Sequence, residues 1–157
     1  MKSITTIGAE ETQALGQQLA AHLQAGDVIL LDGDLGAGKT TFTKGLATGL
    51  GIKRPVKSPT FTIIREYQEG KLPLYHMDVY RLENGGGDEL GLDEYFNGNG
   101  VSVVEWSPFV TDELPEARLV IHLTRDEADD DLRHFVFEAH GNRYEQLLNQ
   151  LEADRHE

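Results

Sequence analysis

Residues 33–40, with the sequence GDLGAGKT, constrain this chain more than any other feature. They fit the pattern of a glycine, four residues of any kind, then Gly-Lys followed by Ser or Thr. Residues 27–32 predict a short buried strand before the loop, and Phe42, Leu46 and Leu50 predict a helix after it. A strand that leads through such a loop into a helix is typical of phosphate binding in nucleotide-binding proteins. Chance matches occur in glycine-containing loops, but the flanking strand and helix favour nucleotide binding.

The chemistry of this loop suits the closely spaced negative charges of a nucleoside triphosphate. Backbone N–H groups of a glycine-rich turn point inward, and the helix N-terminus adds the positive end of its dipole. We expect Gly33, Gly36 and Gly38 to adopt unusual dihedral angles and to let the backbone approach the phosphates closely. Lys39 is expected to reach the β- and γ-phosphates, and the Thr40 hydroxyl is expected to ligate Mg²⁺.

The composition restricts the class of protein. At 157 residues the chain has the size of one domain, so we predict a single domain over 1–157 that includes a hairpin and helix at about 118–157. The absence of cysteine excludes disulfides, thiolate zinc sites and thiol nucleophiles. No apolar run approaches a membrane span, and residues 1–6 lack the apolar stretch of a signal peptide. These features suit a cytoplasmic protein with no membrane partner.

The formal net charge of −13 argues against strong direct binding to a nucleic acid. The acidic residues are unevenly spread, and residues 126–131 carry five of them in one block, DEADDD. We interpret this block as a solvated hairpin tip. A docking surface for a basic partner is the alternative.

Periodicity and turn residues predict the other elements. Gly26 is expected to end the first helix, Gly49 and Gly51 to close the second, and residues 53–60 to form an irregular loop. Strands are predicted at 4–7, 27–32, 61–67, 72–80, 101–105, 119–123 and 134–137, and helices at 10–23, after Lys39, at 90–96 and at about 144–151. We expect two antiparallel hairpins, one from each pair of strands that a short polar segment joins. The sum is an α/β protein with a P-loop NTPase-like three-layer fold, in which helices flank a mixed central sheet.

Hydrolysis of a nucleotide also needs an acid near Mg²⁺ and a group that orients the attacking water. Asp78 and Glu105 both qualify, because each ends a predicted apolar strand. The strand before Glu105 is the more apolar, as a central strand should be, which favours Glu105 for the metal. Asp78 would then contact Mg²⁺ through water or hold the nucleophilic water. Position alone does not divide these roles, and each residue could instead be a surface acid at a strand end.

Five other residues are candidates for the nucleotide site, and each also has an ordinary structural interpretation. Thr60 either senses the γ-phosphate and metal from its loop or caps a secondary-structure element. His76 is interpreted as a packed or hydrogen-bonded strand residue, although it shares a strand face with one of the acids. Trp106 either packs near the base or ribose of a nucleotide or belongs to the core. Arg65 and Arg81 either stabilise transition-state charge or pair with surface acids.

Two absences narrow the class of nucleotide-binding protein. No Asn-Lys-x-Asp stretch is present, so the usual guanine-reading pocket of GTPases is unsupported. No lid that would bind a phosphate acceptor is evident, which disfavours a small-molecule or protein kinase. A kinase remains the main alternative to an ATPase. A third hypothesis is a nucleotide-gated switch that binds the nucleotide without turnover.

Several motifs in order carry a resemblance to a known family. They are the segments 33–41, 56–62 (VKSPTFT), 75–82 (YHMDVYRL), 91–96 (GLDEYF) and 104–106 (VEW). Together they closely resemble the TsaE family, also called YjeE, the bacterial ATPases of tRNA threonylcarbamoyladenosine biosynthesis. The resemblance extends from the first helix to about Leu123. The chain departs from the family where Ser107 stands between Trp106 and Pro108, and in the glycine run at 85–87.

The resemblance implies an ATPase that uses ATP and Mg²⁺, acts slowly alone and is activated by partner proteins. It implies partnership with TsaD and TsaB, and contact with tRNA only through that complex, in which TsaD performs the transfer. By motif, Lys39 is the phosphate-binding lysine, Thr60 lies in a switch-like loop, and Asp78 is the catalytic-site acid. The implied catalytic residues are Lys39, Thr60, Asp78 and Glu105, and the implied metal ligands are Thr40 and Glu105. The predicted nucleotide-binding residues are Asp34, Leu35, Gly36, Ala37, Gly38, Lys39, Thr40, Thr41 and Trp106.

Overall fold

The computed structural model describes residues 2–34, 36–59 and 62–155, and in this part of the chain the strands form one seven-stranded sheet. The strand order is β1-β7-β6-β2-β5-β4-β3. The strands are β1 (Lys2–Ile7), β2 (Val28–Asp32), β3 (Ile64–Tyr67), β4 (Leu74–Asp78), β5 (Val101–Glu105), β6 (Arg118–Arg125) and β7 (Leu132–His140). The α-helices are α1 (Gly8–Ala20), α2 (Lys39–Gly49), α3 (Leu92–Phe96) and α4 (Asn142–Arg155), and short 3₁₀ turns are η1 (Tyr80–Leu82), η2 (Gly87–Glu89) and η3 (Ser107–Glu113).

The centre of the sheet is parallel. β4, β5, β2 and β6 run in the same direction, whereas β3 pairs antiparallel with β4, and β7 pairs antiparallel with both β6 and β1. A parallel strand is covered on both faces, which explains the continuous apolar runs of β2 and β5. The carboxyl ends of β2, β4 and β5 therefore meet at one edge of the sheet, where ligands bind in open α/β folds.

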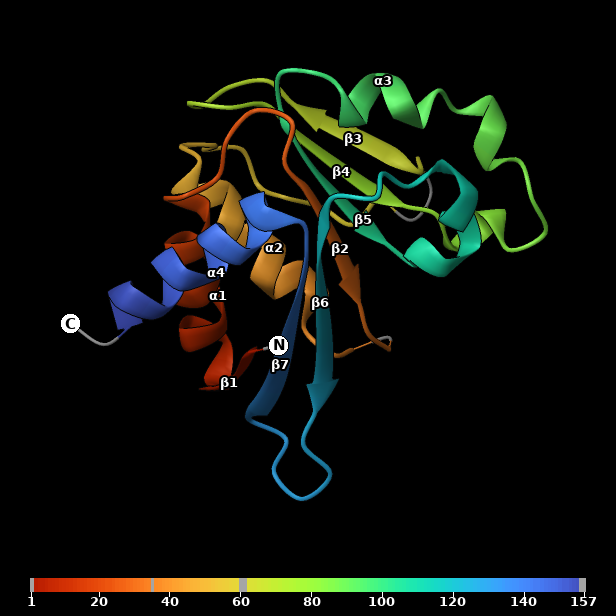
Figure 1. The fold of residues 1–157 in the computed structure, drawn as a ribbon. Coiled ribbons are helices and arrows are strands. Elements are labelled where there is room, and N and C mark those ends of the chain that lie inside the picture. Colours follow the sequence, from red (N-terminus) through yellow and green to blue (C-terminus); the bar gives the residue numbers. More distant parts are fainter. Residues whose placement is uncertain (1, 35, 60–61, 156–157) are drawn as a thin grey trace.

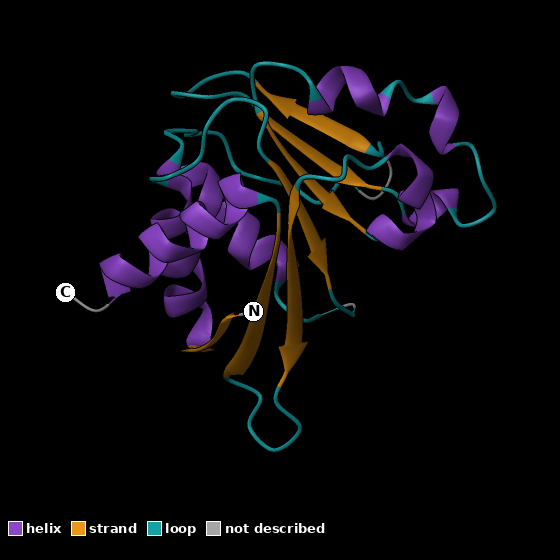
Figure 2. Ribbon diagram, viewed as in Figure 1, coloured by secondary structure: helices purple, strands orange, loops and turns teal. Residues whose placement is uncertain are grey.

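Helices cover both faces of the sheet, so the fold has three layers. Figures 1 and 2 show α1, α2 and α4 gathered on one side, with α3 and the 3₁₀ turns on the other. Alternation along each strand divides the core in the same way: Ile29 and Leu31 of β2 face the α1 and α2 side, and Val28 and Leu30 face the opposite side. The predicted α/β class with a mixed central sheet flanked by helices is confirmed.

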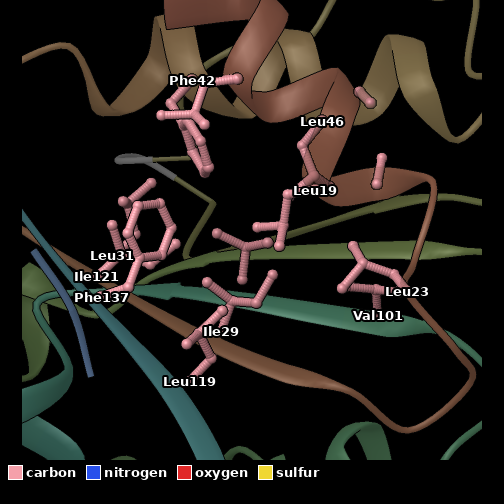
Figure 3. Close-up of a cluster of buried hydrophobic side chains, with 14 of the residues drawn as sticks. Leu19, Leu23, Ile29, Leu31, Phe42, Leu46, Val101, Leu119, Ile121 and Phe137 are labelled. Carbon is pink, nitrogen blue, oxygen red and sulfur yellow. The ribbon is translucent and has the colours of Figure 1, made fainter. Parts of the chain in front are cut away.

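The larger core cluster lies between the sheet and the pair α1 and α2. Figure 3 shows Leu19 of α1 and Phe42 and Leu46 of α2 above Ile29 and Leu31 of β2. Phe42 is fully buried, and its ring lies 5.4 Å from that of Phe135, centroid to centroid. Burial of such a side chain contributes about 1.5–3 kcal/mol. The apolar face of α2 thus fixes this helix, and with it the loop at its N-terminus, against the sheet.

Most boundaries lie within a few residues of the predicted ones. The first helix ends at Ala20 rather than Leu23, and Gly26 lies instead in the turn before β2, with φ +89°. Asp27, predicted in the strand, lies just before β2, and its carboxylate accepts hydrogen bonds from the Gln24 N–H and from Arg143. The predicted strand 72–80 ends early, because Tyr80 enters η1.

The structure adds features that the sequence did not predict. A 3₁₀ turn, η3, begins at Ser107 just after β5, and the predicted first strand, β1, pairs with β7 from the C-terminal part of the chain. None of the helices in the described residues has the length and apolar character that a bilayer crossing requires. The single domain over 1–157 remains a prediction.

Candidate functional site

Two glycines of the loop between β2 and α2 have the left-handed backbone conformation that the sequence predicts for them. Gly36 and Gly38 have φ values of +79° and +106°, as predicted for residues without a Cβ. Gly38 is the N-cap of α2 and supplies no side-chain hydrogen bond to the first turn. The N–H groups at this helix terminus are therefore not capped by a side chain, and an anion can bind them.

Gly33 has a different role from the predicted one. Its φ is not positive, so the expectation of an unusual dihedral angle is wrong at this position. A Cβ at Gly33 would lie 2.4 Å from the Leu123 carbonyl oxygen on β6. Gly33 is thus required because the start of the loop passes close to the β6 backbone.

Lys39 is buried where the loop meets the sheet. Its Nζ donates a hydrogen bond of 2.7 Å to the Gly33 carbonyl and lies 3.6 Å from Glu105 Oε1. The same nitrogen lies 4.4 Å from the ring centroid of Trp106. A buried ammonium needs compensating groups, and an acid, a carbonyl and an aromatic face supply them here.

Asp78 and Glu105 end the neighbouring strands β4 and β5, and both are buried. Their Cα atoms are paired in the parallel register, so both side chains lie on one face of the sheet. This is the face that α1 and α2 cover, because Val101 and Val103, on the same side of β5 as Glu105, belong to that core cluster. Both predicted acids therefore lie beside the N-terminus of α2.

These groups surround one cavity of about 300 Å³. The residues that line it are Gly36, Gly38, Lys39, Thr40, Thr41, Ser58, Asp78, Glu105, Trp106 and Arg133. Within the described residues, no three acidic or imidazole side chains converge on one point to hold a metal by themselves. Mg²⁺ in nucleotide sites takes only one or two carboxylates, and phosphate oxygens and water complete its shell. The residues present thus fit a nucleotide-dependent Mg²⁺ site rather than an all-protein cage.

Backbone strain lies next to this cavity. Among the described residues, Ile63 and Trp106 alone combine a side chain with positive φ, at 69° and 64°. The Ile63 carbonyl accepts a hydrogen bond from the Asp78 N–H, and Trp106 directly follows Glu105. Stacking on Phe109 and a tilted contact with Tyr80 hold the indole of Trp106 in place. Such strain persists only where surrounding contacts enforce it, and it is common at functional sites.

Comparison with known proteins identifies the family. Residues 6–134 match the sequence model of a family described as threonylcarbamoyl adenosine biosynthesis protein TsaE. The chain belongs to the TsaE family. The matched region contains every residue that lines the cavity.

Individual TsaE proteins are similar along most of this chain. The chain is 58% identical to tRNA threonylcarbamoyladenosine biosynthesis protein TsaE of Bacillus subtilis strain 168, over 93% of this chain and 90% of that protein. It is 45% identical to TsaE of Streptomyces coelicolor, over 83% of this chain and 91% of that protein. The crystal structure of Bacillus subtilis YdiB superposes with a TM-score of 0.87 at 52% identity, and covers 98% of this chain and 95% of YdiB.

The structure brings most predicted site residues of this TsaE protein together. Gly36, Gly38, Lys39, Thr40, Thr41, Asp78, Glu105 and Trp106 all line the cavity. Asp34 and Ala37 shape the loop instead, through a 3.1 Å hydrogen bond from the Ala37 N–H to the Asp34 carbonyl. Leu35 and Thr60 lie outside the described residues.

Arg65 and Arg81, considered as charge-stabilising candidates, are not among the described residues that line the cavity. Arg65 is paired with His76 across β3 and β4, and Arg81 lies in η1.

Sequence reasoning missed two residues that line the cavity, Ser58 in the loop after α2 and Arg133. Arg133 lies on β7, and a Cβ added at Gly38 would be 3.5 Å from its Nε. Arg133 also lines an adjoining cavity of about 220 Å³ with Gly38 and Thr41. The register pairs it with Arg125 on β6, directly beside the acidic tip. In the sequence, Arg125 and Arg133 flank the acidic block at 126–131, which was the available signal. The pairing of β6 with β2 is what brings this hairpin to the loop between β2 and α2.

Proposed function

We propose that this protein binds ATP with Mg²⁺ in the cavity at the N-terminus of α2 and hydrolyses it. The observation that carries the proposal is the position of Lys39. Its ammonium lies at the start of α2, between Glu105 and the loop carbonyl of Gly33, at the edge where Asp78 also ends a strand. A cation, an uncapped helix N-terminus and two acids at one sheet edge suit a polyphosphate and its metal.

The residues have distinct proposed roles. Lys39 and the loop N–H groups would hold the phosphates, and Thr40 with Glu105 would hold Mg²⁺, which neutralises phosphate charge when bound. Asp78 would orient the attacking water. Thr60 would belong to a loop that senses the triphosphate state, as the sequence predicts. Trp106 and Arg133, which both line the cavity, would contact the nucleotide.

We further propose that this activity serves threonylcarbamoyladenosine modification of tRNA in the cytoplasm, in a complex with TsaD and TsaB. The names of the related TsaE proteins support the process, and family membership supports the partnership. The formal net charge of −13 fits a subunit that leaves tRNA binding to others. Weak hydrolysis by the isolated chain, stimulated by partners, is the expected behaviour.

The test is ATP hydrolysis by the purified chain, measured alone, with the TsaD–TsaB pair, and with that pair and tRNA. We expect Mg²⁺-dependent release of phosphate that the pair increases. Hydrolysis that the pair leaves unchanged would contradict the partnership but not the ATPase. Phosphorylation of an added protein or small molecule in place of phosphate release would support the kinase alternative.

A further inference from the structure

His76 makes a buried contact with Glu105 that the proposed roles above do not use. The His76 side chain is 0% exposed, and its Nε2 lies 2.6 Å from Glu105 Oε2. The parallel register of β4 and β5 places His76 opposite Val103, so Glu105 is its diagonal neighbour on the same face. The contact therefore follows from the pairing of two neighbouring strands in the parallel part of the sheet.

The proposed role of Glu105 sets the direction of this hydrogen bond. A carboxylate that ligates Mg²⁺ is ionised and only accepts, so Nε2 of His76 donates in that state. The other ring nitrogen, Nδ1, is buried and has no hydrogen-bond partner among the described residues. A buried polar atom without a partner is unfavourable, so an apolar side chain would fill this place in the core better than an imidazole. The contact between Nε2 and Glu105 therefore indicates the role of His76.

The two oxygens of Glu105 have different environments. Oε2 accepts from His76, whereas Oε1 lies 3.6 Å from Lys39 Nζ at the cavity. A carboxylate without a fixed partner rotates about its terminal torsion, which has broad energy wells. One short charge-assisted hydrogen bond removes that freedom and determines which oxygen points into the cavity.

We propose that His76 is a positioning residue, which holds the Glu105 carboxylate so that Oε1 faces the bound metal and nucleotide. This inference rests on the proposed function, in which Glu105 is a Mg²⁺ ligand. Groups that orient a metal ligand in this way typically account for about 10- to 100-fold in metal affinity or activity. The effect should therefore appear first in the dependence on Mg²⁺.

Three substitutions at one position form the test. In His76→Gln the side-chain amide nitrogen stands near the place of Nε2 and can still donate to Glu105. In His76→Asn the same amide is one methylene shorter and does not reach, and His76→Leu removes the donor. Met77→Leu is the matched control, because Met77 is the next residue on β4, is equally buried and faces the other core cluster.

The readout is the Mg²⁺ concentration that gives half-maximal ATP binding to the full chain, followed by Trp106 fluorescence and by hydrolysis. We expect an increase of about 10-fold or more for His76→Asn and His76→Leu, and values near wild type for His76→Gln and Met77→Leu. Equal Mg²⁺ dependence in all folded variants would overturn the positioning role while the proposed function stood. Wild-type protein that neither binds nor hydrolyses ATP would instead contradict the proposed function itself.

A measurement on the unmodified chain keeps the inference testable if a variant does not fold. Long-range ¹H–¹⁵N NMR reports which nitrogen of each imidazole carries the proton. A protonated Nε2 on His76 supports the positioning role. A bare Nε2 overturns it, because that nitrogen could not donate to Glu105.

Discussion

Asp78 and Glu105 are paired in register at the carboxyl ends of two parallel strands, but their side chains have different partners. Glu105 contacts Lys39 and His76, whereas Asp78 accepts a 3.0 Å hydrogen bond from the Tyr80 N–H in the turn that follows β4. One acid thus contacts Lys39 at the start of α2, and the other contacts the segment that leaves the sheet. This difference supports the assignment of Glu105 to the metal and of Asp78 to the water.

Replacement of either acid should impair hydrolysis more than binding. We expect Asp78→Asn and Glu105→Gln to lower the rate of ATP hydrolysis by about 100-fold or more, because groups that handle protons or position water contribute on that scale. At saturating Mg²⁺, ATP affinity should fall by less than about 10-fold, since Lys39 and the loop remain. Asp112→Asn, an exposed acid on η3, is the control and should match wild type. Equal losses of binding and turnover would indicate structural roles for the two acids.

Removal of the loop lysine should weaken ATP binding. A charge-assisted hydrogen bond contributes about 1.5–3 kcal/mol, so Lys39→Ala should raise the dissociation constant by roughly 10- to 150-fold. Equilibrium dialysis with labelled ATP measures this change. Lys44→Ala removes the same charge from an exposed position of the same helix and should bind ATP normally. Undiminished affinity in Lys39→Ala would be incompatible with the phosphate-binding loop.

The fluorescence of Trp106 should report on the cavity. The chain contains one tryptophan, and its ring lies 4.4 Å from Lys39 Nζ. A polyphosphate that binds Lys39 changes the charge next to the indole, so the emission should change on addition of ATP with Mg²⁺. The change should be absent in Lys39→Ala. A signal that does not respond in the wild-type protein would remove Trp106 from the nucleotide site.

The C-terminal helix should depend on the ion pair between Asp27 and Arg143. Asp27 is buried, and its Oδ2 lies 2.6 Å from Arg143 Nη2 at the start of α4. Arg143→Ala leaves that carboxylate without its cation, which should lower the free energy of unfolding by about 2–4 kcal/mol, given the partial exposure of the arginine. Arg155→Ala, at the exposed end of the same helix, should change it by less than about 0.5 kcal/mol. Chemical denaturation measures both, and similar values for the two variants would contradict a structural role of the pair.

The acidic hairpin tip should contribute stability that depends on pH. Hydrogen bonds from His134 and from the Ala128 and Asp129 N–H groups lower the pKa of Asp126. The folded chain therefore favours ionised Asp126, and this stabilisation is present above the ordinary aspartate pKa of about 4 and is lost as the pH falls through the lowered value. Asp126→Asn should lower the melting temperature at pH 6 and have a smaller effect near pH 2. Glu127→Gln, exposed in the same turn, should have little effect at either pH.

The parts of the fold that follow from local sequence were predictable. The loop before Lys39 has a recognisable pattern, and the alternation along β4 correctly placed His76 and Asp78 on one face. The two hairpins were also expected, because short polar segments join their strands. In each case the signal lies within a few residues, where turn chemistry and period-2 alternation act directly.

The remaining features depend on contacts between distant segments. Arg133 reaches the cavity only because β6 pairs with β2, and the hydrogen bond between His76 and Glu105 exists only because β4 lies beside β5. Local preference disfavours the left-handed conformation of Trp106, and stacking on Phe109 together with a tilted contact with Tyr80 holds it. No local pattern in a single sequence specifies such pairings, so these parts of the site required the structure.

A calorimetric titration of the purified chain with ATP, in the presence and absence of Mg²⁺, tests the central claim most directly. If the N-terminus of α2, Lys39 and Glu105 form a nucleotide site, ATP should bind at one site per chain, and more tightly when Mg²⁺ is present. Folded protein that takes up no ATP under either condition would contradict the account.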